Sequence, residues 1–168
     1  GNVGTIESHS KAAHIAQQSI TVVKNDSNLI PVNYLNSKQI NVIDIYGSSF
    51  NHTQSIATKT FLGNLVNVKS YAIDESDNFE YIESIVNKIE ENTKVIINVF
   101  VKASAHKGTV ALNENQTVFV NKLLDKTKNI IMVSYGNPYL IRDFQDIPTY
   151  LCAWENQSHL QEAGARVV

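Results

Sequence analysis

The chain has 168 residues, 43% of them hydrophobic, and a formal net charge of −2. This length predicts a single domain that buries roughly 70% of the surface of its unfolded chain. Lys outnumbers Arg 12 to 2, so the chain has neither the positive charge nor the guanidinium groups that favour nucleic acid or anionic membranes. No apolar run approaches the roughly 20 residues of a membrane span, and the single cysteine, Cys152, excludes an intrachain disulfide and a cysteine-based zinc site.

The first predicted element is a helix that Ser8 or Ser10 caps and that ends near Lys24. Its apolar face is indicated by residues at spacings of three and four, namely Ala12, Ile15, Ala16, Ser19, Ile20 and Val23. A polar turn at 25–28 and an extended segment before Pro31 follow.

Five strand–helix units then follow. The predicted strands are Ile40–Tyr46, 66–73, 94–101, Ile130–Tyr135 and 149–154. The predicted helices are 54–65, 79–92 (capped by Ser76 or Asp77), one that Asn113 caps, 138–144, and one from Gln157 onward. Strands that alternate with helices predict an α/β fold: a doubly wound, mostly parallel sheet of five or six strands, in flavodoxin-like order, with helices on both faces. We therefore expect residues 1–168 to form a single α/β-sandwich domain.

The stretch 129–140 is the most informative. Ile130, Ile131, Met132 and Val133 are apolar on both strand faces, as in the middle of a parallel sheet. Gly136 permits a turn, Asn137 is a suitable cap and Pro138 suits the first position of a helix. Loops of this kind, at the carboxyl ends of the strands, are where α/β domains meet ligands and partners.

The loop after the first parallel strand, Gly47 to Thr53, has one glycine, so it lacks the dinucleotide fingerprint. Its hydroxyl groups suit either a phosphate or an ordinary turn, and we expect no cofactor. His52 and His106 lie in loops that follow neighbouring strands of the sheet. Together with Ser48 and Lys107 they are the candidate substrate-binding residues. Without an Asp, Glu or Cys cluster they do not predict a metal site.

No self-contained active site is predicted. Ser134 lacks the Gly-x-Ser-x-Gly elbow and is expected within a strand. Cys152 is flanked by apolar residues and is expected to be a buried, inert thiol. Asp44 and Glu155 do not form a convincing pair for glycoside hydrolysis, because Asp44 alternates with Ile43 and Ile45 and so points to a sheet face. The predicted set of catalytic residues is therefore empty.

Three segments resemble a known family. Residues 14–25 with 29–32 (His-Ile-Ala-Gln-Gln-Ser-Ile-Thr-Val-Val-Lys-Asn, then Leu-Ile-Pro-Val) resemble the opening of the C-terminal α/β-sandwich domain of glycoside hydrolase family 3. Residues 134–140 contain the Gly-Asn-Pro-Tyr segment of its β-N-acetylhexosaminidase branch, and Trp-Glu-Asn-Gln at 154–157 resembles the turn before the last large helix.

The resemblance implies a larger parent protein. Family members place a catalytic TIM barrel before this domain, and this partner is absent from the 168 residues; the usual tail after the final helix is absent too. In the hexosaminidase branch the barrel carries an Asp nucleophile and an Asp–His acid–base pair, and hydrolyses terminal β-linked N-acetylglucosamine with retention. The carbohydrate substrate would thus be reached through the barrel, and a periplasmic or extracytoplasmic location is slightly favoured.

The β-glucosidase branch instead takes its acid–base Glu from the second domain. The matching loop here is 101–108, Val-Lys-Ala-Ser-Ala-His-Lys-Gly, in which Ala105 stands near the position of that Glu and no acid occurs. A missing proton donor costs about 10²–10⁴-fold in rate, so the resemblance implies a non-catalytic domain of a hexosaminidase. The alternatives are an independent small-ligand or sugar-binding module and a flavodoxin-like carrier.

Overall fold

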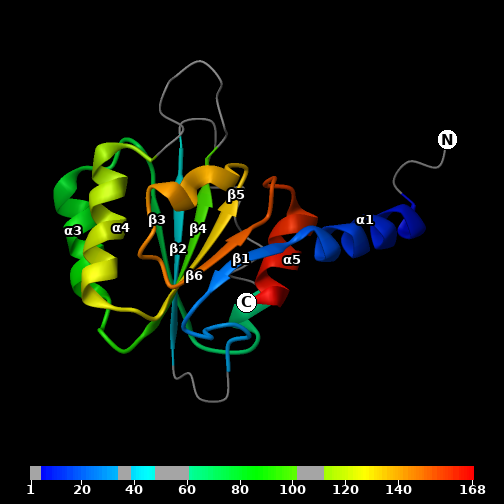
Figure 1. The fold of residues 1–168 in the computed structure, drawn as a ribbon, viewed down its shortest axis with the longest axis horizontal. Helices are drawn as coiled ribbons and strands as arrows, with labels where there is room; N and C mark the ends of the chain where they lie inside the picture. The colour runs from blue at the N-terminus through cyan, green and yellow to red at the C-terminus, as the bar shows by residue number, and fades with distance from the viewer. Residues whose placement is uncertain (1–4, 34–38, 48–60, 102–111) are drawn as a thin grey trace.

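The computed structural model describes residues 5–33, 39–47, 61–101 and 112–168. They form a six-stranded sheet between two layers of helices (Figure 1). The helices are α1 (Ile6–Ser19), α3 (Phe79–Lys88), α4 (Glu114–Lys126), the short 3₁₀ helix η3 (Pro138–Arg142) and α5 (Ser158–Val167). The strands are β1 (Thr21–Asn25), β2 (Ile40–Tyr46), β3 (Val68–Ile73), β4 (Lys94–Phe100), β5 (Ile130–Tyr135) and β6 (Thr149–Cys152).

The strand order is β1-β6-β5-β4-β2-β3. The five strands from β2 to β6 are parallel, and they follow the 2-1-3-4-5 order that the sequence predicts. The predicted bounds of β2 and β5 agree with the structure. The doubly wound α/β sandwich is thus confirmed.

The sheet has a hydrophobic core on each of its two faces. On one face, Ile43, Ile97 and Met132 pack with the buried sides of α3 and α4. On the other face, Val42, Ile96 and Val133 form a second core, to which Leu62 contributes from the end of a helix at 61–63. Figure 1 shows α3 and α4 together on one side and α5 on the other. Each fully buried core side chain stabilises the fold by about 1.5–3 kcal/mol, because its apolar surface is removed from water.

The opening segment differs from the prediction. The helix ends at Ser19, not near Lys24, and the residues that follow form β1, an edge strand that pairs antiparallel with β6. Thr21, Val22 and Val23 are β-branched, which favours a strand over a helix. The apolar residues beyond Ser19 continue the helical spacing of three and four, which is why the helix was predicted to extend to Lys24. The partner strand lies more than 120 residues later, so the local sequence does not indicate this pairing.

Two helix caps are also corrected. Thr5, not Ser8 or Ser10, caps α1, and its hydroxyl oxygen accepts a hydrogen bond from the Ser8 backbone N–H at 3.2 Å. Asn78, not Ser76 or Asp77, caps α3 in the same way. The cap of α4 at Asn113 is confirmed. Within the described part of the chain, no helix has the length and apolar character needed to cross a bilayer.

Candidate functional site

Three parallel strands end in aromatic residues at the carboxyl edge of the sheet. Tyr46, Phe100 and Tyr135 occupy the same register position on β2, β4 and β5. Their rings stack with centroid separations of 5.3 and 4.8 Å and interplanar angles of 12° and 9°. All three are buried, and such offset aromatic pairs add about 0.5–1.5 kcal/mol each beyond area burial. This aromatic row forms a rigid layer at the carboxyl edge of the sheet.

The Gly-Asn-Pro-Tyr loop after β5 is held by hydroxyl groups of side chains on β5 and β6. Gly136 has a φ of 110°, a backbone conformation that would be strained in any residue with a side chain. The Ser134 hydroxyl donates to the Asn137 carbonyl at 2.5 Å, and the Tyr150 hydroxyl reaches the same oxygen at 3.4 Å. The Asn137 side chain in turn accepts from the Tyr139 N–H and caps η3. Ser134 is therefore a buried structural residue, as expected, and the loop is held rather than free.

Burial raises the pKa of Tyr150 from its ordinary value of 10 to about 12. Below pH 10 the phenol keeps its proton in both folded and unfolded chains, whereas between pH 10 and 12 only the unfolded chain loses it. We therefore expect Tyr150 to lower the free energy of unfolding by about 2–3 kcal/mol over this interval. Urea titrations at pH 9 and pH 11 would measure about half of this loss, roughly 1.3 kcal/mol, because pH 11 is the midpoint of the interval. Tyr150→Phe should show a smaller drop, and an equal drop in both proteins would contradict the assignment.

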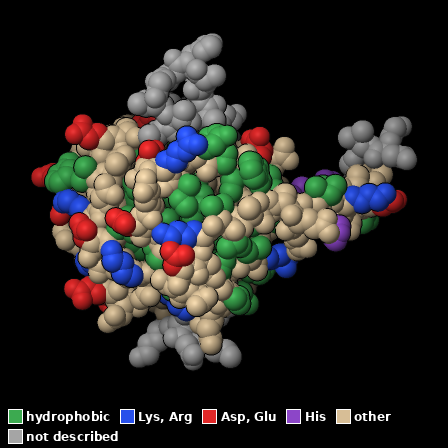
Figure 2. Space-filling model, in the orientation of Figure 1, with side chains coloured by type: hydrophobic (Ala, Val, Ile, Leu, Met, Phe, Trp, Pro, Cys, Tyr) green, Lys and Arg blue, Asp and Glu red, His purple; other side chains and the backbone are tan. Residues whose placement is uncertain are grey.

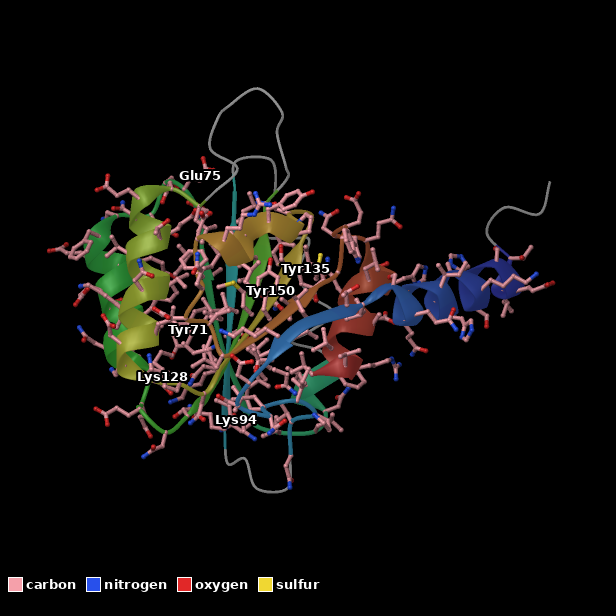
Figure 3. The ribbon with its side chains drawn as sticks, in the orientation of Figure 1. Tyr71, Glu75, Lys94, Lys128, Tyr135 and Tyr150 are labelled. Atoms are coloured by element: carbon pink, nitrogen blue, oxygen red, sulfur yellow. The ribbon has the colours of Figure 1, made fainter. Side chains whose placement is uncertain are left out.

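The end of β2 and the loop after β3 are tied to the start of α4. The Gln116 amide donates to the Tyr46 carbonyl at 2.9 Å, while its oxygen accepts from the Asn113 N–H at 3.1 Å. The Asn113 side chain donates to the Glu75 carbonyl at 3.2 Å. The carboxyl edge is thereby braced at β2 and β3 by one capping motif. In Figure 3 Glu75 lies at this edge, and Lys94 and Lys128 lie at the opposite one.

The acidic turn after β3 uses two of its carboxylates for local structure. Asp74 accepts hydrogen bonds from the Ser76 backbone N–H and hydroxyl, at 2.8 and 2.6 Å. Asp77 accepts from the Asp74 N–H at 2.8 Å. These bonds close an Asx-type turn, and the turn therefore gives no indication of an acid–base pair.

Trp154, which follows β6, is the feature that sequence reasoning missed. Its φ of 61° is a left-handed conformation that is rare for a bulky residue. The Glu155 N–H bonds to the Ala153 carbonyl at 2.6 Å and closes the turn. The indole N–H donates to the Ser19 carbonyl at 3.1 Å and approaches the Thr21 hydroxyl at 3.4 Å. The residue as a whole is 52% exposed. No sequence pattern marks a positive φ at tryptophan.

The candidate substrate-binding residues Ser48, His52, His106 and Lys107 lie outside the described residues. They stay predictions. Their loops leave the sheet after Gly47 and Val101, at the ends of the adjacent strands β2 and β4. The order β3-β2-β4 reverses there, and this reversal is the switch point at which α/β sheets bind ligands.

The remaining candidates are structural. Cys152 is buried, and burial raises the pKa of its thiol, which keeps it protonated and unreactive. Asp44 is fully buried in the sheet, where its Oδ1 accepts from the Asn98 amide at 2.8 Å. Glu155 lies in the exposed turn after β6. Asp44 and Glu155 thus occupy different environments and do not form a pair.

Within the part of the chain that the structure describes, no group of three or more His, Cys, Asp or Glu side chains is placed to bind a metal ion. His9 lies against His159 of α5, with ring centroids 5.8 Å apart. His159 is partly buried. This contact joins α1 to α5.

The architecture, a doubly wound sandwich with a braced carboxyl edge and one antiparallel edge strand, defines the class of protein. Residues 15–153 match the family described as the bacterial glycosyl hydrolase family 3 C-terminal domain. The chain belongs to this family. A comparison with curated proteins finds no match.

Solved structures share this fold. A family 3 β-N-acetylglucosaminidase from Paenibacillus sp. str. FPU-7 aligns with a TM-score of 0.72 at 15% identity, over 97% of this chain and 30% of that chain. A β-glucosidase from Listeria innocua aligns with a TM-score of 0.75 at 15% identity, over 97% and 25%. A β-glucoside phosphorylase aligns at 0.68 and 20% identity, over 96% and 29%. The 168 residues thus span less than a third of these relatives, whose activities differ.

Proposed function

We propose that the chain is the non-catalytic C-terminal domain of a retaining β-N-acetylhexosaminidase of glycoside hydrolase family 3. In this proposal an N-terminal TIM barrel of the same polypeptide carries the catalytic groups and acts on terminal β-linked N-acetylglucosamine, in peptidoglycan or other glycans. The domain packs beside the barrel, and the loops at its carboxyl edge shape the rim of the cleft.

The observation that carries the proposal is the acid-free loop 101–108. The family match supports the domain's parentage, and the loop separates the two branches, because a β-glucosidase of this family takes its proton donor from this loop. The sequence there has Ala105 and no Asp or Glu. The Gly-Asn-Pro-Tyr segment at 136–139 supports the same branch.

The test is an assay of the full-length parent with two aryl substrates. We expect hydrolysis of an aryl β-N-acetylglucosaminide with retention of configuration, and at least about 100-fold lower kcat/KM for the matching β-glucoside, because general acid catalysis from this domain is missing. The purified 168-residue chain should hydrolyse neither. Preference for the glucoside, or turnover by the 168 residues alone, would overturn the proposal. The upstream coding sequence gives an earlier check, since a barrel needs about 250 residues.

A further inference from the structure

Tyr139 presents an aromatic ring to solvent from a firmly held part of the carboxyl edge. The residue is 60% exposed, whereas Asn137 before it and Leu140 after it are buried. The Asn137 side chain accepts a hydrogen bond from the Tyr139 backbone N–H at 3.0 Å, and the Ser134 hydroxyl donates to the Asn137 carbonyl. Figure 1 shows η3, the short orange helix that carries Tyr139, at the edge toward which the parallel strands point. The position of the ring is therefore fixed by its neighbours.

The Arg142 guanidinium covers one face of this ring. Its central carbon lies 4.8 Å from the ring centroid, and Figure 2 shows basic and hydrophobic side chains next to each other over η3. No carboxylate of the described residues forms an ion pair with this guanidinium, the adjacent Asp143 included. Stacking uses the flat face of the group. The N–H donors in its plane are therefore available to a ligand.

A sugar that carries a carboxylate fits this pair of side chains. A guanidinium offers two parallel N–H donors that match the two oxygens of a carboxylate. Stacking on the ring orders the arginine in advance, so less entropy is lost when the ligand binds. The exposed tyrosine ring offers apolar surface to the C–H face of a pyranose, and its hydroxyl is a donor for sugar oxygens. A neutral glycan would use the ring but not the paired donors.

We propose that Tyr139 and Arg142, called here the η3 pair, bind the sugar next to the cleaved N-acetylglucosamine and favour substrates in which that sugar carries a carboxylate. This inference rests on the proposed function, which places the carboxyl edge at the rim of the barrel's cleft, and adds to it a choice between acidic and neutral glycans. The η3 pair contacts the leaving group away from the bond that is cleaved. The preference should therefore appear in KM, as for a contact that is equally strong in substrate and transition state.

The experiment compares two disaccharides in the full-length parent. One joins N-acetylglucosamine to N-acetylmuramic acid, and the other is N,N′-diacetylchitobiose, which has the same linkage and lacks only the lactyl ether that supplies the carboxylate. We expect KM to be about tenfold lower for the acidic disaccharide. Arg142→Gln should raise that KM about tenfold, so that the two KM values become similar. Equal KM values in the unchanged enzyme, or a preference that survives in Arg142→Gln, would overturn the inference.

Arg166→Gln is the matched control for the arginine. Arg166 is also exposed and also stacks on an aromatic ring, at 5.0 Å from the centroid of Phe61. It lies in the last turn of α5, near the C-terminal end that Figure 1 places away from the carboxyl edge. Its substitution should leave both KM values unchanged. A loss of the preference in Arg166→Gln as large as in Arg142→Gln would contradict the role of the η3 pair.

The ring is tested by Tyr139→Ala, which keeps the backbone N–H that bonds to Asn137. We expect this variant to raise KM for both disaccharides, because both lose the apolar surface of the ring. Unchanged KM values for both would remove Tyr139 from the site and overturn the inference.

An aryl β-N-acetylglucosaminide separates this inference from the proposed function. A parent that cleaves the aryl substrate but shows no preference for the acidic disaccharide keeps the proposed function and contradicts the η3 pair. A parent that does not cleave the aryl substrate contradicts the proposed function, and the inference falls with it.

Discussion

Replacing Gly164 with alanine is expected to destabilise the domain, although alanine is ordinarily the better helix former. A Cβ at Gly164 would lie 2.6 Å from the Tyr135 hydroxyl oxygen, closer than any real contact of this kind. The Tyr135 ring cannot move aside cheaply, because it is buried and stacks on Phe100. Overpacking of this type costs about 1–3 kcal/mol, and α5 would regain about 1 kcal/mol from the loss of glycine. We expect a net loss of about 1 kcal/mol in urea unfolding, and of about 2 kcal/mol at most.

The explanation is checked by removing the hydroxyl. In a Tyr135→Phe background the nearest atoms to the new Cβ are the ring carbon at 3.5 Å and Val133 at 3.6 Å, which are ordinary contacts. Gly164→Ala should therefore become stabilising by about 1 kcal/mol in that background. Gly63→Ala serves as the control, because a Cβ there meets nothing within 4 Å. A destabilisation that persists without the hydroxyl would show that the clash is not its cause.

Asn98→Leu is expected to have the other large effect, a loss of about 2–4 kcal/mol. The Asn98 amide donates to Asp44 at 2.8 Å, and both side chains are fully buried in the middle of the sheet. Leucine has a similar volume but no donor, so Asp44 Oδ1 would lose this hydrogen bond inside the protein. Leaving a buried polar group unsatisfied costs far more than an ordinary hydrogen bond contributes. Urea unfolding of the purified variant measures the loss.

The adjacent strand offers a matched control. Asn41 is also buried, but in the described part of the chain neither side-chain polar atom has a hydrogen-bond partner. Asn41→Leu should consequently be neutral or stabilising. The double variant Asp44→Leu/Asn98→Leu should cost less than the sum of its two single variants, since it removes both partners together. Equal losses for Asn41→Leu and Asn98→Leu would contradict the role assigned to the Asp44–Asn98 bond.

The parallel strands were predictable because their sequences are locally consistent. Residues 130–133 are apolar on both faces, and the following Gly136, Asn137 and Pro138 each supply a conformation that the turn needs. β1 was not predictable in the same way, because its pairing with Thr149–Cys152 is a contact between distant parts of the sequence. The Asp44–Asn98 bond and the contact of Tyr135 with Gly164 are also tertiary facts. Sequence reasoning placed Asp44 correctly on a sheet face but could not name its partner.

The site shows the same division. The Gly-Asn-Pro-Tyr loop was expected from its residues, whereas the convergence of the Ser134 and Tyr150 hydroxyls on one carbonyl depends on two strands in register. The strained backbone of Trp154 has no counterpart in residue type, since tryptophan is not a left-handed former. Only the hydrogen bond from the indole N–H to the Ser19 carbonyl, at the end of α1, shows what holds the ring there.

The antiparallel edge of the sheet has a consequence for synthesis on the ribosome. β1 is made before the other described strands of the sheet, and its partner β6 lies more than 120 residues later in the chain. At about 5–20 residues per second, β1 emerges roughly 6–25 s before β6 can pair with it. During this interval Thr21–Asn25 has no strand to bond, and its valines are available to other chains. The nascent domain is therefore most exposed to misassociation at β1. This exposure ends when β6 has been made and pairs with β1.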